Sequence, residues 1–343
     1  MRKFKVGLIG CGSIFPMHAQ SLVKTPGVTI RAICDIKPAR AKKAAKRYQA
    51  KAYFDFKKML KTEELDSVHI LTPHYLHPEM TIEAAKRKIN ILCEKPIAID
   101  PKDADRMIAA CRKNCVALGV ISQNRYNPGS RLVKKIIKSG KLGKIKAIKL
   151  VLSYHKPDSY YEKSDWKGTW DKEGGGVLID QSIHFIDVLQ WLIGDRVEYV
   201  EANIANRMHK SIEVEDLAEG VIKFKKGTYI CFYLNNYYSY DDHTEIELDC
   251  EKGRVNIIKD SAKIRFYSGR ELKAAPKSNE HIDYGDGVKS YWGYCHWNQI
   301  EEFYRDLRSK RKHKIDGLEA KKTLEIVHNI YKSARLRKRI YFN

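Results

Sequence analysis

The sequence has no long hydrophobic run and no paired cysteine motif, and each absence excludes a class of protein. No apolar stretch approaches the ~20 residues of a membrane-spanning helix. The N-terminal apolar stretch is interrupted by Gly7 and Gly10 and does not read as a signal peptide. The eight cysteines contain no C-x-x-C pair, which argues against a disulfide framework and a structural zinc site. We therefore expect a cytoplasmic protein with no membrane contact and no bound metal.

Acidic residues are also few: 42 Asp and Glu stand against 64 Lys and Arg, a net charge of +22 over 343 residues. Such an excess is found in nucleic-acid-binding proteins. Here, however, the basic residues are spread along the whole chain, and the densest run, 308–314, lies between two expected helices. No DNA-reading motif is present, so we expect solvated basic surfaces and no nucleic-acid partner. An anionic substrate stays open as an explanation.

The length predicts two domains, and the first of them alternates strands with helices. Alternation at this spacing is typical of a parallel sheet with both faces covered. The expected strands are 5–9, 28–34, 67–71, 89–93 and 115–120, and the expected helices are 37–48, 74–88 and 100–114.

The pattern changes after residue 126, where β-rich runs follow one another with turn signals at 226–227 and 252–253. This pattern predicts an antiparallel sheet. The runs are 144–155, 197–208, 218–224, 228–234, 244–250 and 254–258, with helices expected at 130–139, 178–193, 297–309 and 318–336. We therefore divide the chain into a parallel α/β domain, 1–125, and an α+β domain with a mostly antiparallel sheet, 126–343.

A glycine turn follows the first expected strand and precedes a helix. In this context Gly10 permits a tight turn, Gly12 lets the backbone approach a pyrophosphate, and the helix N-terminus favours a negative charge. Phe15 stands where the G-x-G-x-x-G pattern has its third glycine. Taken alone, the motif could equally be an ordinary strand-to-helix turn.

Asp35 ends the second expected strand and strengthens the interpretation as a dinucleotide site. A carboxylate at this place accepts hydrogen bonds from ribose hydroxyls and repels a 2′-phosphate. The sequence therefore predicts NAD as the cofactor and NADP as the less favoured one. Lys37 and Arg40 lie close by in the sequence and could hold a phosphate.

Two further groups of residues have side chains that could act in catalysis. Lys95 follows a buried strand, and ligands bind at the carboxyl ends of such strands. Its ammonium could donate to a substrate hydroxyl, or it could be a surface lysine. Asp180 and His184 lie four residues apart in an apolar helix after glycines 174–176. This pair could be a general base with its orienting carboxylate, a structural hydrogen bond, or two ligands of a metal.

Taken together, these residues resemble the Gfo/Idh/MocA family, named after glucose–fructose oxidoreductase and inositol dehydrogenase. The landmarks occur in the family's order over nearly the whole chain. Phe15, in place of a small residue, and Ser182, where glycine is common, depart from the pattern. The landmarks are Gly10-Cys11-Gly12-Ser13-Ile14, His18, Asp35, Thr72-Pro73, His77, Glu94-Lys95-Pro96, Arg125-Tyr126-Asn127-Pro128, 174–184 and 316–320.

The resemblance implies a Rossmann domain with a doubly wound parallel sheet, followed by an α+β domain with a large open, mostly antiparallel sheet. It places Lys95, Asp180 and His184 on catalytic positions, which are also substrate-binding. The other substrate-side candidates are Trp166, Trp170 and His296. The implied cofactor-binding residues are Gly10, Gly12, Ser13, Ile14, Asp35, Thr72, Pro73, His77, Glu94, Lys95 and Arg125.

The resemblance further implies an NAD-dependent oxidoreductase that acts on the secondary alcohol of a sugar, sugar derivative or cyclitol. His184 would take the hydroxyl proton, Asp180 would orient His184, and Lys95 would polarise the same oxygen. An NAD-using glycosidase and a non-catalytic sugar or dinucleotide sensor are the alternatives. Because the run 229–234 puts aromatic residues on both sides of a strand, we also expect a homodimer or homotetramer built through the second sheet.

Overall fold

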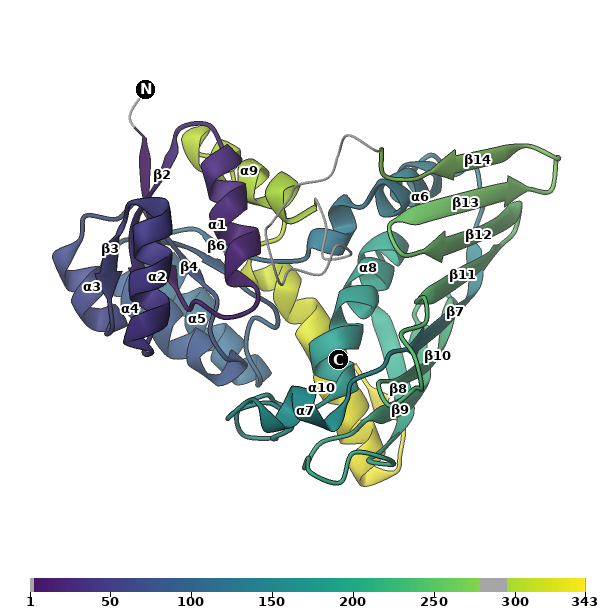
Figure 1. The fold of residues 1–343 in the computed structure, drawn as a ribbon. Helices are drawn as coiled ribbons and strands as arrows, with labels where there is room; N and C mark the ends of the chain where they lie inside the picture. The colour runs from purple at the N-terminus through teal and green to yellow at the C-terminus, as the bar shows by residue number, and fades with distance from the viewer. Residues whose placement is uncertain (1–2, 278–294, 343) are drawn as a thin grey trace. The chain divides into compact units, whose positions relative to one another are not determined.

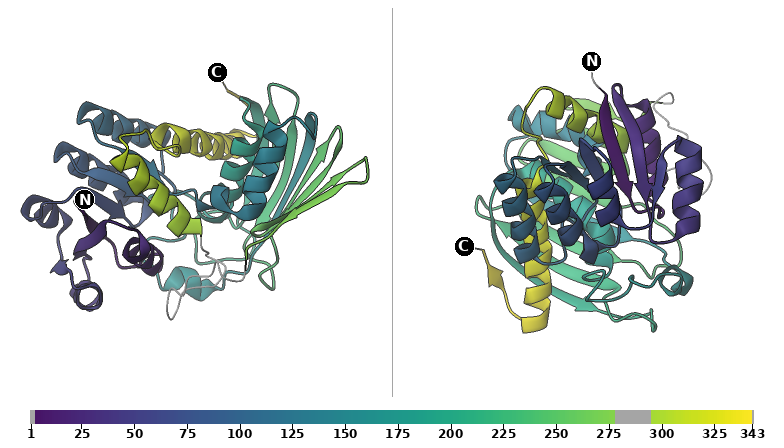
Figure 2. Two further views of the ribbon diagram at one scale, coloured as in Figure 1. Left: turned by 90° about the horizontal axis from the view of Figure 1, so that it is seen from above. Right: turned by 90° about the vertical axis from the view of Figure 1, so that its left-hand side faces the viewer.

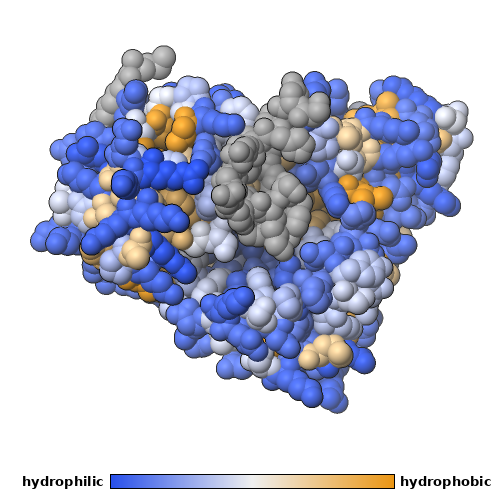
Figure 3. Space-filling view, in the orientation of Figure 1, coloured by the Kyte–Doolittle hydropathy of each residue, from blue (hydrophilic) through white to orange (hydrophobic). Residues whose placement is uncertain are grey.

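A computed structural model describes residues 3–277 and 295–342, which form two compact units (Figure 1). Within the described residues, the first unit comprises 3–123 and 295–321, and the second comprises 124–277 and 322–342. Most of the face drawn in Figure 3 is hydrophilic, with apolar side chains in small patches. No helix within the described residues is long and apolar enough to cross a membrane.

The first unit contains a six-stranded sheet with the order β3-β2-β1-β4-β5-β6, in which every pair of neighbouring strands is parallel. This confirms the predicted doubly wound Rossmann sheet. Its strands are β1 Phe4–Ile9, β2 Val28–Cys34, β3 Lys51–Tyr53, β4 Ser67–Ile70, β5 Asn90–Cys93 and β6 Leu118–Val120. The helices around it are α1 Phe15–Lys24, α2 Pro38–Tyr48, α3 Phe56–Thr62, α4 His77–Lys86 and α5 Pro101–Lys113.

Local sequence signals explain where several of these elements begin. Asp55 and Asp100 accept hydrogen bonds from backbone N–H groups in the first turns of α3 and α5, the role of N-cap residues. The central strands are buried on both faces, so their sequences are continuous apolar runs rather than alternating ones. A chain with these signals therefore folds into covered parallel strands whose carboxyl ends lie along one edge.

Helix α9, Cys295–Arg308, belongs to the first unit although it follows the second sheet in sequence. Phe303 and Tyr304 are fully buried in the core of the first unit, and the Gln299 amide bonds the backbone of Val120 and Ser122. The sequence-based division at 125/126 assigned this helix to the second domain. An amphipathic helix shows which of its faces is buried, but not which sheet covers that face.

The second unit contains a nine-stranded sheet with the order β14-β13-β12-β11-β7-β10-β9-β8-β15. It is mostly antiparallel, as expected, with one parallel pair, β7 and β10. The strands are β7 Ile145–Ser153, β8 Val197–Ala205, β9 Leu217–Phe224, β10 Tyr229–Asn235, β11 Glu245–Cys250, β12 Gly253–Ile258, β13 Ser261–Phe266, β14 Glu271–Ala274 and β15 Ile340–Tyr341.

Helices of the second unit cover one face of this sheet (Figure 2). They are α6 Pro128–Lys138, α8 Ile183–Ile193 and the later part of α10, Gly317–Leu336, while the short α7, Asp158–Glu162, lies in a connecting segment. On the other face, β10 exposes Tyr229 and Tyr233 by more than a third of their surface. One face of the sheet is therefore packed and the other is open to solvent.

The basic run 308–314 is largely paired with acidic residues. Lys314 lies 2.8 Å from Glu302, Lys312 lies 2.7 Å from Asp316, and Arg311 lies 3.6 Å from Asp306. The charges of this run are therefore partly balanced locally, because the acidic partners come from the neighbouring helix and turn.

Candidate active site

The glycine turn lies between β1 and α1, and its two glycines have different surroundings. Gly10 has a φ of +101°, and a Cβ added there would lie 2.6 Å from the Leu71 carbonyl oxygen, at the end of β4. Gly12 is exposed, and a Cβ added there would have no neighbour within 4 Å. Gly10 is therefore required by the fold, whereas Gly12 leaves open space in front of the turn.

The Asp35 carboxylate, at the end of β2, faces the glycine turn. It accepts hydrogen bonds from Cys11 N–H and Lys37 N–H, both at 2.7 Å. Each carboxylate oxygen thus accepts one backbone hydrogen bond and keeps capacity for another. The arrangement holds a negative charge beside the turn, where ribose hydroxyls could donate to it.

These residues fit a dinucleotide. Helix α1 begins with Pro16 in its first turn, and no side chain among the described residues caps its N-terminus. An uncapped helix N-terminus behind an open glycine turn is a binding site for phosphate. Gly10, Gly12, Ser13 and Ile14 would therefore surround the pyrophosphate, and Asp35 would bind the ribose.

Thr72 and Pro73 follow β4, and they are tied to the segment after β5 by His77. The His77 side chain is completely buried, and its ring nitrogens lie 2.8 Å from the Pro96 carbonyl oxygen and 3.0 Å from that of Thr72. Burial lowers the pKa of His77 despite these two acceptors, so the neutral ring donates to one carbonyl at a time. His77 therefore links two strand ends, and its predicted contact with the cofactor stays a prediction.

Glu94 and Lys95 directly follow β5, and Glu94 is the more deeply buried of the two. Its Oε1 atom lies 2.8 Å from His18 Nε2 and 3.8 Å from His296 Nε2, and its Oε2 atom accepts the Lys95 N–H at 3.2 Å. Burial opposes the charge on Glu94, but the contact with His18 outweighs it and lowers the pKa of Glu94 to about 2. The carboxylate is therefore ionised, and His296 lies beside Glu94 in the first unit.

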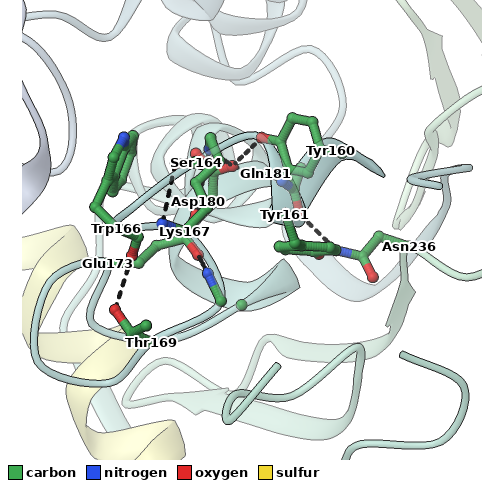
Figure 4. Close-up of polar contacts among 12 residues, drawn as sticks. Tyr160, Tyr161, Ser164, Trp166, Lys167, Thr169, Glu173, Asp180, Gln181 and Asn236 are labelled. Carbon is green, nitrogen blue, oxygen red and sulfur yellow. Dashed lines mark hydrogen bonds and ion pairs between the residues drawn. The ribbon is translucent and has the colours of Figure 1, made fainter. Parts of the chain in front are cut away.

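In the second unit, Asp180 is held by a group of residues that the sequence did not single out (Figure 4). Its Oδ2 atom accepts hydrogen bonds from Tyr160 OH at 2.8 Å, from Gln181 Nε2 at 2.6 Å and from Lys167 Nζ at 3.0 Å. Lys167 Nζ also lies 3.3 Å from Glu173 Oε1. We call Tyr160, Lys167, Glu173, Asp180 and Gln181 the Lys167 cluster.

The Lys167 ammonium is enclosed by carboxylates and aromatic rings. It lies 4.5 Å from the centre of the Trp166 ring and 4.6 Å from that of Tyr160, distances at which a cation is attracted to the ring faces. Burial opposes its charge, but Asp180, Tyr160 and Glu173 outweigh burial and hold the pKa of Lys167 well above its usual value. Burial raises the pKa of Glu173 to about 7, against the attraction of Lys167.

The helix that carries the predicted catalytic pair starts irregularly. Residues Leu178–Ser182, including Asp180, form a π-helical turn, and the α-helix α8 begins only at Ile183. Such turns are rare and are often found at functional sites. The sequence pattern predicted an α-helix over 178–193, so this turn corrects the expectation for its first five residues. His184 is half-buried in the first turn of α8.

The remaining site candidates have structural partners in the second unit. Trp170 packs edge-on against Tyr331 at 5.3 Å, and its Nε1 donates to the Glu213 carbonyl at 3.0 Å. Arg125 forms a buried two-bond ion pair with Asp187, with both distances 2.7 Å. Arg125 is buried and Trp170 is half-buried, and their predicted roles toward cofactor and substrate stay predictions.

The sequence interpretation missed Lys167, Glu173 and Tyr160 in one unit and His69 and Tyr304 in the other. Lys167 offered a weak signal, because it lies within a tryptophan-rich segment just before the glycine run. A lysine in a polar segment is predicted to be exposed to solvent unless its carboxylate partners are known. The pairing of these residues became visible only in the fold.

The parallel sheet and the glycine turn are typical of a dinucleotide-binding protein, and comparison with known proteins shows that it is an oxidoreductase and gives its family. Residues 4–122 match the oxidoreductase family GFO_IDH_MocA with an NAD-binding Rossmann fold, and residues 130–256 match the GFO/IDH/MocA C-terminal domain. The chain belongs to this family, as its landmarks predicted. Its first unit is an NAD-binding Rossmann domain, which confirms the predicted cofactor.

Among solved structures, the chain is similar to the WlbA dehydrogenase from Bordetella pertussis in complex with NADH and UDP-GlcNAcA. The two share 28% identity over 100% of this chain and 98% of the other, with a TM-score of 0.88. Myo-inositol 2-dehydrogenase from Thermotoga maritima is 27% identical over 73% of this chain and 74% of its own length. D-apiose dehydrogenase from Paraburkholderia graminis is 25% identical over 98% of this chain and 88% of its own.

The two glycines predict different outcomes when each is replaced by alanine. Gly12→Ala should weaken NADH binding by at least ~10-fold at an unchanged Tm, because the new methyl group enters only the space in front of the turn. Gly10→Ala should lower Tm, since a non-glycine residue in its backbone conformation costs about 1–3 kcal/mol. Fluorescence titration with NADH and calorimetry on both variants test this. A Gly12→Ala protein with normal NADH affinity would contradict the assignment.

Lys167→Met should destabilise the second unit by ~3–5 kcal/mol, because it leaves two buried carboxylates without their cation. Since the folded pKa of Glu173 lies above its usual value, the folded state binds more protons between pH ~4.5 and ~7, and stability falls as pH rises through that range. Because Lys167 lowers the pKa of Glu173, its removal should raise that pKa further, and the loss in Lys167→Met should be larger at pH 8 than at pH 6. Lys172→Met, on the same loop, is the control. Equal thermal unfolding of the two variants would refute the ion-pair cluster.

Proposed function

We propose that the protein is an NAD-dependent dehydrogenase acting on a secondary alcohol carbon of a sugar, a sugar derivative or a cyclitol. The observation that carries the proposal is the open glycine turn at Gly12 with the Asp35 carboxylate beside it, in a chain of this family. When bound, NAD supplies the chemistry of accepting or giving a hydride. The protein binds both reactants, orients them and handles the proton.

Lys95 and His184 have complementary tasks in this proposal. Lys95, at the carboxyl end of β5, donates a hydrogen bond to the substrate hydroxyl and stabilises the negative charge that develops on its oxygen. His184 accepts the hydroxyl proton on a ring nitrogen as general base. In the reverse direction the same ring returns the proton to the alcohol.

In this proposal Asp180, four residues before His184 in the chain, supplies a fixed negative charge to the base. A carboxylate stabilises an imidazolium and fixes the orientation of its ring. The Lys167 cluster holds the Asp180 carboxylate by three donors, so its direction is set before a substrate binds. Lys167 thereby acts as a positioning residue for Asp180.

For the substrate we propose a sugar acid, free or linked to a nucleotide. Two observations support this class: the net charge of +22, and the full-length similarity to a dehydrogenase solved with UDP-GlcNAcA. The second candidate is a neutral cyclitol, because myo-inositol 2-dehydrogenase is a relative of similar identity. NADH absorbance measured with UDP-GlcNAcA, glucuronate, glucose and myo-inositol distinguishes them. Absence of NADH formation with all four would reject the proposed substrate classes.

We also propose that the protein self-associates through the open face of the second sheet. Tyr229 and Tyr233 on β10 present partly exposed aromatic rings there, and apolar surface of this kind is typical of interfaces between subunits. A homodimer or homotetramer would bury this face.

Asp35→Ser should reduce the preference for NAD over NADP by at least ~10-fold in kcat/KM, because it removes a carboxylate that a 2′-phosphate would meet at close range. The unmodified protein should prefer NAD. Asp103→Ser, a half-buried position on α5 whose carboxylate pairs with Arg106, controls for the loss of one negative charge. A wild-type preference for NADP of ~10-fold or more would show that Asp35 does not select the cofactor.

Lys95→Ala and His184→Ala should each lower kcat by at least ~10²-fold while NADH affinity changes little, because each removes a group that acts on the reacting oxygen. Asp180→Asn should cost less, since it keeps the shape and loses the charge. The double variant of Lys95 and His184 should lose less than the product of the single losses. A stable Lys95→Ala protein with near-normal kcat would contradict the mechanism.

A further inference from the structure

A continuous chain of hydrogen bonds crosses the interior of the first unit and ends at Glu94. Ser67 Oγ lies 2.8 Å from Tyr304 OH, which lies 2.9 Å from His69 Nε2. His69 Nδ1 lies 2.8 Å from His18 Nδ1, and His18 Nε2 lies 2.8 Å from Glu94 Oε1. Ser67 and His69 come from β4, His18 comes from α1 and Tyr304 from α9. We call these five residues the Ser67–Glu94 chain.

Each member of the chain is buried, so its polar atoms depend on one another. His18, His69, Ser67 and Tyr304 are 0% exposed, and Glu94 is 6% exposed. A buried polar group that loses its partner costs about 1–3 kcal/mol. The rings also pack together, since His69 stacks on Tyr304 with centres 5.9 Å apart and meets His18 edge-on at 5.0 Å. The chain is therefore both a packed and a hydrogen-bonded unit.

The donors of the chain can all point toward Glu94. In that arrangement Ser67 donates to Tyr304, and Tyr304 donates to His69 Nε2. His69 then donates from Nδ1 to His18, and His18 donates from Nε2 to the carboxylate. Both rings are neutral in this arrangement. Burial, followed by the neighbouring His18, lowers the pKa of His69 well below its usual value, in agreement with a neutral ring.

One added proton on His18 reverses the other bonds without breaking any. His18 then donates from both nitrogens, to Glu94 and to His69, and His69 donates from Nε2 to Tyr304, which donates to Ser67. Every bond between the five residues is made in either protonation state. The chain therefore holds the Glu94 carboxylate in place whether or not His18 is charged.

The charged and titratable groups around Glu94 come from each neighbouring element of the first unit. They include His18 on α1, His69 on β4, His77 on α4, Lys95 in the segment after β5, and His296 on α9, whose Nε2 lies 3.8 Å from Glu94 Oε1. Since the backbone N–H of Lys95 donates to Glu94 Oε2, displacement of the carboxylate would also displace the segment that carries the Lys95 ammonium.

We propose that His18, His69 and Tyr304 are positioning residues, which fix Glu94 and through it the catalytic Lys95 by way of the Ser67–Glu94 chain. None of the three would need to touch substrate or cofactor. The proposal rests on the proposed dehydrogenase function, because Lys95 must act in catalysis for its position to affect kcat. Loss of activity should therefore be graded, and it should decrease with the number of hydrogen bonds between the altered residue and Glu94.

A series of variants tests the gradient by kcat, KM, NADH affinity and Tm. His69→Leu breaks the chain next to His18 and should lower kcat about 10-fold. Tyr304→Phe removes a hydrogen bond one step further from Glu94 and should lower kcat about 3-fold, and Ser67→Ala, at the far end, should lower it less than about 2-fold. His69→Gln offers both a donor and an acceptor and should recover most of the activity that His69→Leu loses. KM should change little.

Tyr53→Phe is the matched control, since it removes a hydroxyl that donates to Glu63 at 2.7 Å in the same unit, outside the chain. It should leave kcat unchanged. The proposal is overturned if His69→Leu and Tyr304→Phe keep the wild-type kcat, or if His69→Gln recovers none of the kcat that His69→Leu loses. It is equally overturned if the decreases in kcat across the variants simply parallel the decreases in Tm. His18, Glu94 and His296 have ligand atoms within 4.8 Å of one another. The proposal is therefore also overturned if EDTA abolishes activity and Zn²⁺ restores it, because His18 would then serve a metal.

A measurement without turnover separates this proposal from the proposed function. The ring ¹⁵N signals of His18 and His69 should show one proton shared between the two Nδ1 atoms, and Tyr304→Phe should shift the His69 Nε2 signal. If the wild-type protein oxidises none of the sugars while these signals are as expected, the proposed function is wrong and the chain exists. If turnover is normal and Tyr304→Phe moves no ring signal, the proposed positioning chain is wrong and the dehydrogenase function stands.

Discussion

Burying a carboxylate is costly unless donors or cations lie beside it, and this constraint organises the candidate site residues within each unit. Glu94 is stabilised by His18 and the Lys95 backbone, and Asp180 is stabilised by Lys167 and two neutral donors. In each case a predicted catalytic residue is a buried anion or is adjacent to one. The partners come from separate parts of the chain, so each cluster forms only when its own unit is folded.

The same constraint assigns different roles to the polar groups of each unit. Gly12 is exposed, and the Asp35 carboxylate beside the turn is 9% exposed and keeps capacity for further hydrogen bonds. The groups behind them, such as His77, His69 and Tyr304, have no exposed surface. In a site of this kind, some residues contact the ligand and others lie behind them. Hydrogen bonds from the residues behind fix the direction of those that contact the ligand.

The Rossmann sheet and the dinucleotide site could be predicted from the sequence, because short motifs determine them. Gly10, Gly12 and Asp35 lie at strand ends with a defined spacing, and the carboxyl ends of parallel strands converge on one edge. The partner of Asp180 could not be predicted, since Lys167 is thirteen residues away across an irregular loop. Tyr304 could not be predicted either, because it reaches His69 only once α9 packs in the first unit. Very short strands such as β3 and β15 lack a pattern long enough to recognise.

The return of α9 to the first unit has a consequence for biosynthesis. A ribosome has completed all six strands of the Rossmann sheet long before it adds Phe303 and Tyr304, which fill the core of that sheet's unit. Until then, the apolar surface that α9 covers stays without its final partner. The nascent first unit therefore stays incompletely packed while β7 to β14 of the second sheet are translated, and in this interval its exposed apolar surface favours aggregation.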